Sequence, residues 1–396
     1  MKQRNNEIEE SRNNYMMYRK LGKTGLDVSA IGLGCEHLDK KPYEQVKETI
    51  DAALGYGANI LDVFMPGAEV RGYVAKALGE RRRDVFIQGH ICSTDVSQQY
   101  DISRDLPNVQ KYFEDMLRIF GGYIDLGMLF FIDSEQDYKN VFDTEIAGYA
   151  ERLKRQGDIL HIGFSSHNPE TAMKAINTGL PEMVMFSVNP AFDMLPSETY
   201  VFDHFESGFG AEMFRGVDPG RTRFYKLCEQ KQIGITTMKT FGAGKLLSEQ
   251  QTPFEKPLTV EQCVEYALSR PAVASVLPGC KSGAEVDGVM RYLSCDAAQR
   301  DYSRILSGVR NDFAGNCLYC SHCQPCPAGI DIAAAMKCLD VATLGGGAVP
   351  PAARAEYIKL EKGGADCVNC GSCESRCPFG VPVMKNMGRA AEIFGR

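Results

Sequence analysis

Short apolar segments alternate with amphipathic stretches between residues 29 and 295. Eight of these segments have the length and composition of strands: SAIGLG (29–34), NILDV (59–63), DVFIQG (84–89), IDLGMLFF (124–131), ILHIGFS (159–165), MVMFSV (183–188), GITTMKT (234–240) and VASVLPG (273–279). Three intervening stretches repeat apolar residues with the helical period, at Val46, Ile50, Ala53 and Leu54, at Val109, Phe113, Met116, Leu117 and Phe120, and at Val260, Cys263, Val264, Ala267 and Leu268. This alternation predicts an α/β fold in which eight parallel strands close into a (β/α)8 TIM barrel.

The longest interruption of the pattern is a polar, glycine-containing segment at 190–224, between the sixth and seventh strands. Insertions of this kind lie on the catalytic face of a barrel and shape its substrate pocket. The opening residues MKQRNNEIEESRNN are polar and lack the apolar core of an export signal, which predicts a flexible tail over residues 1–15 and a cytoplasmic protein. No apolar run approaches the roughly 18–20 residues that span a bilayer, so no membrane partner is expected.

Length and charge add two expectations. The chain has 396 residues and a formal net charge of −7 at pH 7, without a basic stripe, which argues against a nucleic-acid partner. The length accommodates a barrel domain over residues 16–295 and a smaller, mostly α-helical domain over residues 296–396.

The C-terminal part carries eight of the fifteen cysteines in two short runs, CLYCSHCQPCP (317–327) and CVNCGSCESRCP (367–378). Disulfides are rare in the reducing compartment that the missing export signal predicts, so metal or redox chemistry is favoured. The other seven cysteines are interpreted as small buried hydrophobes. They are Cys35, Cys92, Cys228, Cys263, Cys280, Cys295 and Cys338.

The spacing of the clustered cysteines predicts two [4Fe–4S] clusters. The second run is C-x2-C-x2-C-x3-C-P, the bacterial ferredoxin motif, and the first differs from it by one residue. In two-cluster ferredoxins the cysteine before proline binds the other cluster. Structural zinc, the alternative, usually takes two separated pairs of ligands. The assignment is Cys317, Cys320, Cys323 and Cys377 to one cluster, and Cys367, Cys370, Cys373 and Cys326 to the second.

The segment YRKLGKTGLDVSAIGLGC (18–35) resembles the opening of the aldo-keto reductases, with their N-terminal hairpin and first strand. Later landmarks of that family line up with NILD (59–62), AKALGERRRDVFI (75–87), YIDLGMLFF (123–131), HIGFSSHNPET (161–171) and VLPGCKSGAEV (276–286). Together with the cysteine runs, the chain between residues 16 and 390 resembles the subgroup of aldo-keto reductases that carries a ferredoxin-type domain.

The resemblance implies NADPH-dependent carbonyl reduction, with a Tyr as proton donor assisted by Asp, Lys and His. Asp62 matches the family's Asp. The Tyr position falls on Gly67, the Lys position on His90 and the His position on Phe130. Because neither the phenol nor the cation that lowers its pKa remains, hydride transfer by the family's route is not expected.

The nicotinamide site that the resemblance implies is altered too. The family's Ser-Asn after the fifth strand is Ser-Ser here, and its Gln on the sixth strand corresponds to Met185. The sequence leaves open whether NAD(P)H or a flavin binds. The cofactor-binding candidates are Ser165, Ser166, Lys239, Lys281 and Ser282.

Asp62, His90 and His167 should gather at the C-terminal mouth of the barrel, where barrel enzymes carry their chemistry. Asp62 beside His90 would give an oriented imidazole that acts as acid or base near neutral pH, assisted by His167. The structural alternatives are a satisfied carboxylate for Asp62, a filler polar group for His90 and a helix cap near Pro169 for His167.

The sequence therefore favours an iron–sulfur oxidoreductase of the aldo-keto reductase superfamily. Electrons would pass through the two clusters to or from a small organic substrate at the barrel mouth, in exchange with an external electron carrier. Two alternatives stay open: a non-redox lyase or isomerase with structural clusters, and a non-catalytic module for electron transfer or redox sensing.

Overall fold

The computed structural model describes residues 16–96, 99–196, 217–306, 315–344 and 348–396. The predicted tail over residues 1–15 and most of the predicted insertion lie outside the described residues. The chain forms two compact units, and each unit is assembled from segments that are far apart in the sequence. The continuous domain ranges predicted from the sequence therefore stay a prediction. Unit 1 comprises Met1–Ser187, Gly234–Thr240 and Ala274–Cys295, and unit 2 comprises Val188–Ile233, Phe241–Val273 and Asp296–Arg396.

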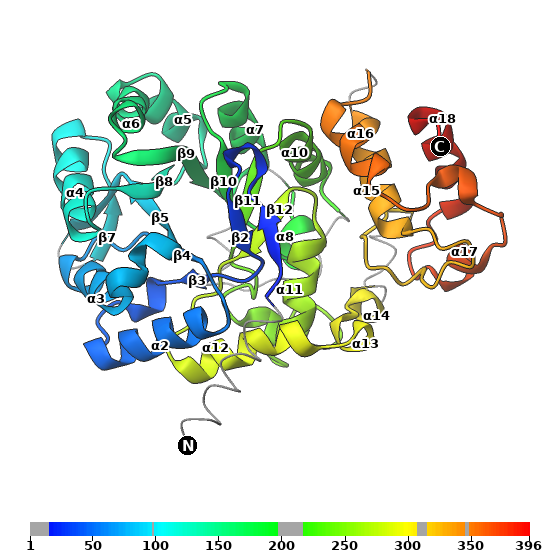
Figure 1. The fold of residues 1–396 in the computed structure, drawn as a ribbon, viewed down its shortest axis with the longest axis horizontal. Coiled ribbons are helices and arrows are strands. Elements are labelled where there is room, and N and C mark those ends of the chain that lie inside the picture. The colour runs from blue at the N-terminus through cyan, green and yellow to red at the C-terminus, as the bar shows by residue number, and fades with distance from the viewer. Residues whose placement is uncertain (1–15, 97–98, 197–216, 307–314, 345–347) are drawn as a thin grey trace. The chain divides into compact units, whose positions relative to one another are not determined.

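An eight-stranded parallel sheet with the order β12-β11-β10-β9-β8-β5-β4-β3 forms the centre of unit 1 (Figure 1). Bridges from Ile31 to Val276 and from Gly34 to Gly279 join the first strand to the last, so the sheet closes and the predicted barrel is confirmed. All eight predicted strands are present, with ends that shift by a few residues. They are β3 Leu33–Gly34, β4 Ile60–Val63, β5 Phe86–Ile91, β8 Ile124–Leu129, β9 Ile159–Ser166, β10 Met183–Ser187, β11 Gly234–Met238 and β12 Val273–Val276.

Two antiparallel hairpins accompany the barrel. The hairpin of β1 (Tyr18–Lys20) and β2 (Asp27–Ser29) is the one that the family resemblance implies. Its Leu21 is fully buried, and a Cβ on Gly234 at the start of β11 would lie 2.5 Å from the Leu21 backbone, so the hairpin closes the N-terminal end of the barrel. The second hairpin was not predicted and follows β5; its strands are β6 Ser93–Val96 and β7 Gln99–Ile102.

Helices follow the barrel strands in unit 1, and polar residues start several of them. Asp105, Ser134 and Asn168 accept hydrogen bonds from backbone N–H groups in the first turns of α4, α5 and α7. The helices are α2 Tyr43–Gly55, α3 Ala68–Leu78, α4 Leu106–Ile119, α5 Glu135–Phe142, α6 Glu145–Gln156, α7 Pro169–Asn177 and α12 Gly283–Met290.

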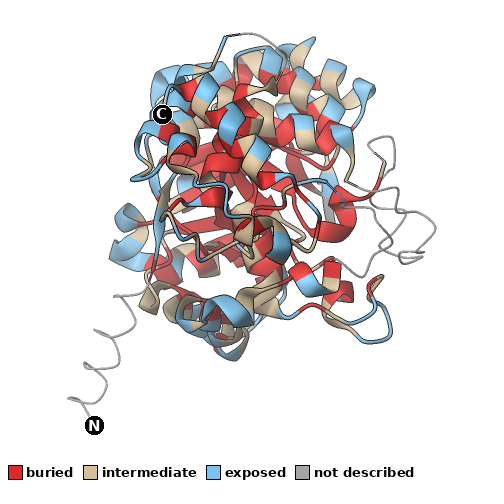
Figure 2. Ribbon diagram, turned by 90° about the vertical axis from the view of Figure 1, so that its right-hand side faces the viewer, coloured by how far each residue is buried: buried red, intermediate tan, exposed pale blue. Residues whose placement is uncertain are grey.

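The barrel interior contains a closely packed apolar cluster. All six residues of β8 are buried, as expected for a parallel strand that is covered on both faces. Figure 2 shows the result as buried strands and as helices that are buried on one side and exposed on the other. The interior cluster consists of Leu21, Val28, Ile60, Leu126, Met128, Met183, Met185, Ala274 and Leu277.

Unit 2 is helical where it is described. Its core centres on α15, whose sequence IAAAMKCLDVA is mostly buried, and on the stacked rings of Tyr357 and Phe394, 4.0 Å apart. Seven cysteines of the two runs pack partly or fully buried in this core. The helices are α8 Pro190–Asp193, α10 Pro219–Gln230, α11 Val260–Ser269, α13 Ala297–Arg300, α14 Ser303–Leu306, α15 Ile332–Ala342, α16 Pro351–Ile358, α17 Ser372–Arg376 and α18 Val383–Phe394.

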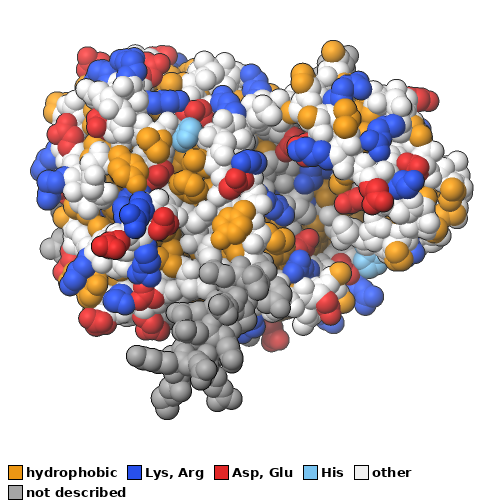
Figure 3. Space-filling view, viewed as in Figure 1, with side chains coloured by type: hydrophobic (Ala, Val, Ile, Leu, Met, Phe, Trp, Pro, Cys, Tyr) orange, Lys and Arg blue, Asp and Glu red, His pale blue; other side chains and the backbone are white. Residues whose placement is uncertain are grey.

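Within the described ranges, no helix combines the length and apolar character needed to cross a membrane. Lys and Arg side chains are interspersed with Asp and Glu over the face drawn in Figure 3.

Candidate functional site

Asp62 on β4 and His90 on β5 meet inside the barrel near the carboxyl ends of their strands. His90 Nε2 lies 2.8 Å from Asp62 Oδ1, and Gln88 Nε2 donates to the same oxygen at 2.6 Å. Gln88 in turn accepts from Thr236 Oγ1 at 3.0 Å. Asp62 and His90 are 3% and 2% exposed, so the imidazole is held in one orientation away from bulk water.

The other ring nitrogen of His90, Nδ1, lies in an aromatic environment. Among the described residues, Nδ1 of His90 has no hydrogen-bond partner although it is buried. The ring packs edge-on against Phe130, with centroids 5.1 Å apart, and lies 6.0 Å from the Phe64 ring. When Asp62 accepts a hydrogen bond from Nε2–H, neutral His90 presents a bare lone pair at Nδ1.

A second buried histidine–carboxylate pair lies on the neighbouring strand ends. His167 Nδ1 lies 2.9 Å from Asp133 Oδ2, and the His167 backbone N–H donates to Asp133 Oδ1 at 2.6 Å. Burial alone would raise the pKa of Asp133, but the charge and hydrogen bonds of His167 hold that pKa below its usual range. The helix cap is Asn168, whose side chain accepts from Thr171 N–H, so His167 is not the capping residue.

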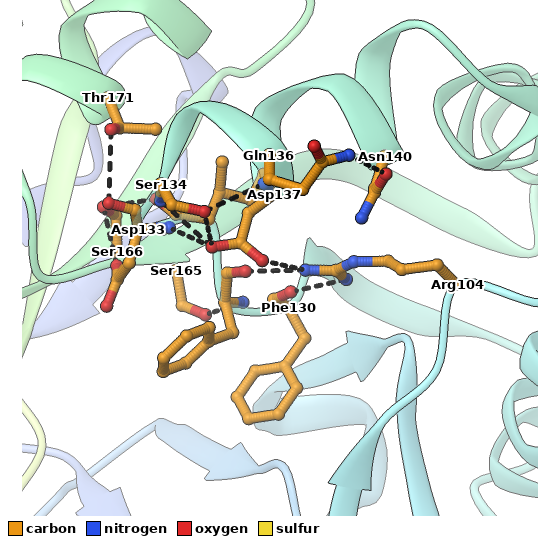
Figure 4. A network of polar contacts seen from close by, with 12 residues as sticks. Arg104, Phe130, Asp133, Ser134, Gln136, Asp137, Asn140, Ser165, Ser166 and Thr171 are labelled. Atoms are coloured by element: carbon orange, nitrogen blue, oxygen red, sulfur yellow. Dashed lines mark hydrogen bonds and ion pairs between the residues drawn. The ribbon is translucent and has the colours of Figure 1, made fainter.

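Arg104 fixes the backbone that carries the aromatic residues (Figure 4). Its guanidinium donates to the carbonyl oxygens of Phe130 at 2.9 Å and Phe131 at 2.7 Å, and pairs with Asp137 at 3.7 Å. Phe131 has a φ of +60°, a backbone conformation that residues other than glycine rarely adopt. Two carbonyl contacts from one rigid cation stabilise this turn.

Ser165 and Ser166, the serines predicted for a nicotinamide site on β9, form hydrogen bonds with backbone groups of the protein itself. Ser165 Oγ accepts the Phe131 N–H at 2.9 Å, and Ser166 Oγ lies 2.7 Å from the Ile132 carbonyl oxygen (Figure 4). Lys239 follows β11 with a φ of +58°, and its Nζ lies 3.9 Å from Glu36 Oε2.

Carboxylates surround the candidate phosphate position at the start of α12. Ser282 caps the helix by accepting from Glu285 N–H, and the Glu285 carboxylate accepts the Lys281 N–H at 3.0 Å. Lys281 Nζ also lies 3.5 Å from Glu285. A Cβ on Gly283 would lie 2.9 Å from Glu48 Oε1, so a second carboxylate stands at the same helix end. Both would repel a phosphate there.

The two cysteine runs contribute to two cavities in unit 2. One cavity is lined by Cys317, Cys320, Cys323 and Cys377 together with apolar residues such as Ile332 and Phe379. The other is lined by Cys367, Cys370, Cys373 and Cys326 together with Ile330 and Met387. The structure thus brings the thiols together in the two groups of four that the spacing assigns, with one cysteine exchanged between the runs.

The loops around these cavities are tightly wound. Tyr319, Ser321 and Asn369 have positive φ angles between the cysteines, and such conformations concentrate at functional sites. Burial raises the pKa of Cys317, against a backbone hydrogen bond from Tyr319, and raises the pKa of Cys323 to about 12. Hydrogen bonds from Ser372 instead lower the pKa of the exposed Cys370. None of the fifteen cysteines, all of them within the described residues, forms a disulfide.

In the part of the chain that the structure describes, no three His, Cys, Asp or Glu side chains converge in a way that suits one metal ion. A mononuclear site gathers its ligands around one centre, with Zn–S distances of about 2.3 Å. A cluster of four irons holds each thiolate at a different corner, and its ligands stand further apart.

Gln88, Thr236 and Asp133 were not predicted as residues of the site. Gln88 lies two residues before His90 on β5. Because side chains alternate between the two faces of a strand, this spacing indicates that both side chains point to the same side, into the barrel. Thr236 and Asp133 carried no such signal, because their partners come from distant strands and loops.

Comparisons with known proteins agree with this architecture. The model of the aldo/keto reductase family matches residues 30–262. The uncharacterized oxidoreductase YqkF of Bacillus subtilis (strain 168) is 26% identical over 289 residues, which cover 67% of this chain and 87% of YqkF. The holo form of the aldo-keto reductase AKR11C1 from Bacillus halodurans superposes with a TM-score of 0.56 at 21% identity, over 72% of this chain and 94% of that one. The chain belongs to the aldo/keto reductase family and is an oxidoreductase of that superfamily.

Proposed function

We propose that the protein is an iron–sulfur oxidoreductase in which two [4Fe–4S] clusters exchange electrons with a small organic substrate bound at the barrel mouth. The observation that carries this proposal is the pair of cavities in unit 2. Each gathers four cysteines and otherwise mostly apolar residues, and each takes thiols from both runs. This donor set fits thiolate-bound clusters, which when bound would supply single electrons.

The residues around the Asp62–His90 pair support a role for His90 in moving the proton that accompanies reduction. Asp62 holds Nε2 and leaves Nδ1 as the atom that takes up or gives a proton. The neighbouring Phe64 and Phe130 rings exclude water from this nitrogen. A substrate hydroxyl at Nδ1 of the neutral imidazole would satisfy the buried nitrogen by donating to it. In the reductive direction the imidazolium, which carries protons on both nitrogens, would give the Nδ1 proton to a substrate oxygen.

Several contacts support a reaction that does not use NADPH in the family's manner. The hydrogen-bond partners of Asp62 among the described residues are Gln88 and His90, and no tyrosine hydroxyl takes their place. Gly67, at the Tyr position, starts α3 without a polar side chain. Glu285 and Glu48 stand where a phosphate would have to bind. We therefore propose that an external carrier, rather than a nicotinamide, supplies the electrons.

Anaerobic purification of the full chain with iron and sulfide analysis tests the clusters. We expect close to eight irons and eight sulfides for each chain, because two [4Fe–4S] clusters are proposed. Stoichiometric zinc with no acid-labile sulfide would refute the proposal.

The electron source is tested by turnover with reduced viologen or with NADPH. Candidate substrates are small carbonyl and unsaturated compounds, and consumption is followed by oxidation of the viologen. Turnover with viologen and none with NADPH is the expected result. Turnover that is the same with oxidised and reduced clusters would instead favour the lyase or isomerase hypothesis.

A further inference from the structure

Arg270, directly after α11 in unit 2, is a buried cation. It is 5% exposed, and its Nη2 donates to Ser269 Oγ at 3.0 Å and to the Leu318 carbonyl oxygen. Its Nε donates to the Tyr266 carbonyl oxygen at 3.3 Å, and the guanidinium lies 4.4 Å from the Tyr266 ring centroid. All these partners are neutral, whereas arginine keeps its charge in proteins.

The neighbouring cations have carboxylate partners that Arg270 lacks. Arg221 lies 3.3 Å from Asp193, and Lys226 lies 3.8 Å from Asp340. Among the described residues, Arg270 forms no ion pair within 4.0 Å. Asp193 lies close enough for its charge to act on Arg270, but its contacts are made with Arg221 and with two tyrosine hydroxyls. A buried charge is costly unless a counter-charge offsets it, so a negative group is expected nearby.

The peptide that Arg270 holds belongs to the first cysteine loop. Leu318 lies between Cys317 and Cys320, and its carbonyl oxygen also accepts from Tyr302 at 2.8 Å. Arg270 is therefore positioned beside one of the two proposed clusters.

The second cysteine loop is more open to water. Cys370 is exposed, and Val368 beside it is 66% exposed. The arginine of that run, Arg376, is partly exposed and donates to the carbonyl oxygens of Cys323 and Pro325. Water screens charges at this loop more strongly than at Arg270.

We propose that Arg270 is the counter-charge of the cluster held by Cys317, Cys320, Cys323 and Cys377, and makes it the more easily reduced of the two. Reduction adds one negative charge to a cluster. A fixed positive charge in a medium of low dielectric constant stabilises that state and raises the reduction potential. Electrons that enter at the exposed second loop would then move inward to the first cluster. The inference rests on the proposed function.

A small anion in the adjacent cavity is the competing explanation for the charge of Arg270. This cavity of about 130 Å³ is lined by Arg270 and Lys226, but also by Asp193 and Asp340. An anion there would face both carboxylates, so the cluster is the better counter-charge.

A redox titration of the anaerobic full-length protein, followed by electron paramagnetic resonance, tests the inference. Iron and sulfide analysis comes first, and a chain without clusters would refute the proposed function itself. With both clusters present, the wild type should show two separate midpoint potentials. Arg270→Gln should lower the higher potential and leave the lower one unchanged. Arg270→Lys keeps the charge and should lower the higher potential by a smaller amount. This variant also provides the test if Arg270→Gln does not fold.

The matched control is Arg304→Gln, which removes an exposed arginine from the same unit. It should leave both potentials unchanged, because solvent screens that charge. Equal potentials in the wild type, or potentials that neither Arg270 variant moves, would overturn the inference. Potentials that neither Arg270 variant moves are the result expected if an anion in the cavity, rather than the cluster, offsets the charge of Arg270.

Discussion

Asp62 and His90 form a buried pair inside the barrel. The resemblance to the family predicts that Asp62 matches its catalytic Asp and that His90 stands at the position of its Lys. A lysine beside a phenol lowers the phenol's pKa, whereas a histidine at 2.8 Å from a carboxylate is itself able to move a proton. A histidine at the Lys position is therefore consistent with the prediction that Gly67 replaces the Tyr.

His90→Gln and Asp62→Asn test this role in turnover with reduced viologen. Loss of a general acid or base costs about 10²–10⁴-fold in rate, so we expect kcat to fall by that range in His90→Gln while iron content stays unchanged. Asp62→Asn should lower kcat less, because the histidine remains but loses its fixed orientation. The measurement is steady-state turnover at several pH values.

His161→Gln is the matched control. His161 also lies beside a carboxylate, Glu182 at 3.1 Å, and its side chain is 19% exposed. Its turnover should stay close to that of the wild type. A His90→Gln variant that is as active as this control would exclude His90 from the reaction.

Single residues were predictable where a motif or a strand period fixed their place. Asp62 and His90 could be paired because they end adjacent parallel strands. Asp133 could not be paired with His167, because the carboxylate lies in a loop after β8 and no sequence period places loop side chains. The crossed grouping of the cysteines was predicted from the ferredoxin spacing, and each of the two cavities is lined by one of these groups of four.

At the scale of elements, the turn after β8 depends on a side chain from another loop. Arg104→Gln should lower the free energy of unfolding by about 1–3 kcal/mol, because the Phe130 and Phe131 carbonyls lose a charged donor. Urea denaturation followed by circular dichroism measures this effect. Arg155→Gln, which removes an exposed arginine from α6, should change stability by less than about 0.5 kcal/mol. Equal effects of the two variants would show that the hydrogen bonds of Arg104 do not stabilise the turn after β8.

Glu182 connects α6 to β9 through a pH-dependent contact. Burial alone would raise its pKa, but hydrogen bonds from His161, Lys154 and the Ile162 N–H lower the pKa to about 2. A lowered carboxyl pKa adds stability above the pKa of the unfolded chain, near 4.5, and that stability is lost as the pH falls toward 2. Glu182→Gln should therefore cost about 1–2 kcal/mol at pH 7.

Unfolding curves of the wild type and Glu182→Gln between pH 7 and pH 3 check this expectation. The difference between them should be constant down to about pH 5 and shrink below it. A difference that does not depend on pH would mean that the carboxylate charge is unimportant for this contact.

The elements were predictable to the extent that each has a period of its own. The eight strands followed from apolar runs, and their ends shifted because hydrogen bonding rather than hydropathy ends a strand. The β6–β7 hairpin was missed, because the segment STDVSQQYDI is polar and its pairing depends on the turn.

At the scale of the whole molecule, family membership and the cysteine loops make separate claims. The family model covers residues 30–262 and does not extend to either cysteine run. The runs, in contrast, line cavities within the apolar core of unit 2. Membership of the family therefore follows from similarity, whereas the proposal of iron–sulfur chemistry rests on the arrangement of eight thiols.

The proposed clusters predict that the stability of unit 2 depends on iron. Each cavity takes thiols from both runs, so each cluster would tie residues 317–326 to residues 367–377 across some forty residues of intervening chain. Metal binding of this kind contributes directly to folding free energy. Removing the iron anaerobically with a chelator should lower the melting temperature. It should also open the segments around both runs to protease, while cleavage of unit 1 stays slow.

Limited proteolysis with mass spectrometry of the fragments locates the change. Cys228→Ser is the matched control, since Cys228 is a buried cysteine of unit 2 outside both runs and should keep its iron and its protease resistance. Cys377→Ser removes a thiol from the first cavity and should lose iron and resistance together. Because its loop packs on the same core as the other run, cleavage should appear near residues 317–326 as well as near the substitution. Cleavage confined to the substituted loop would show that the two runs do not share their clusters.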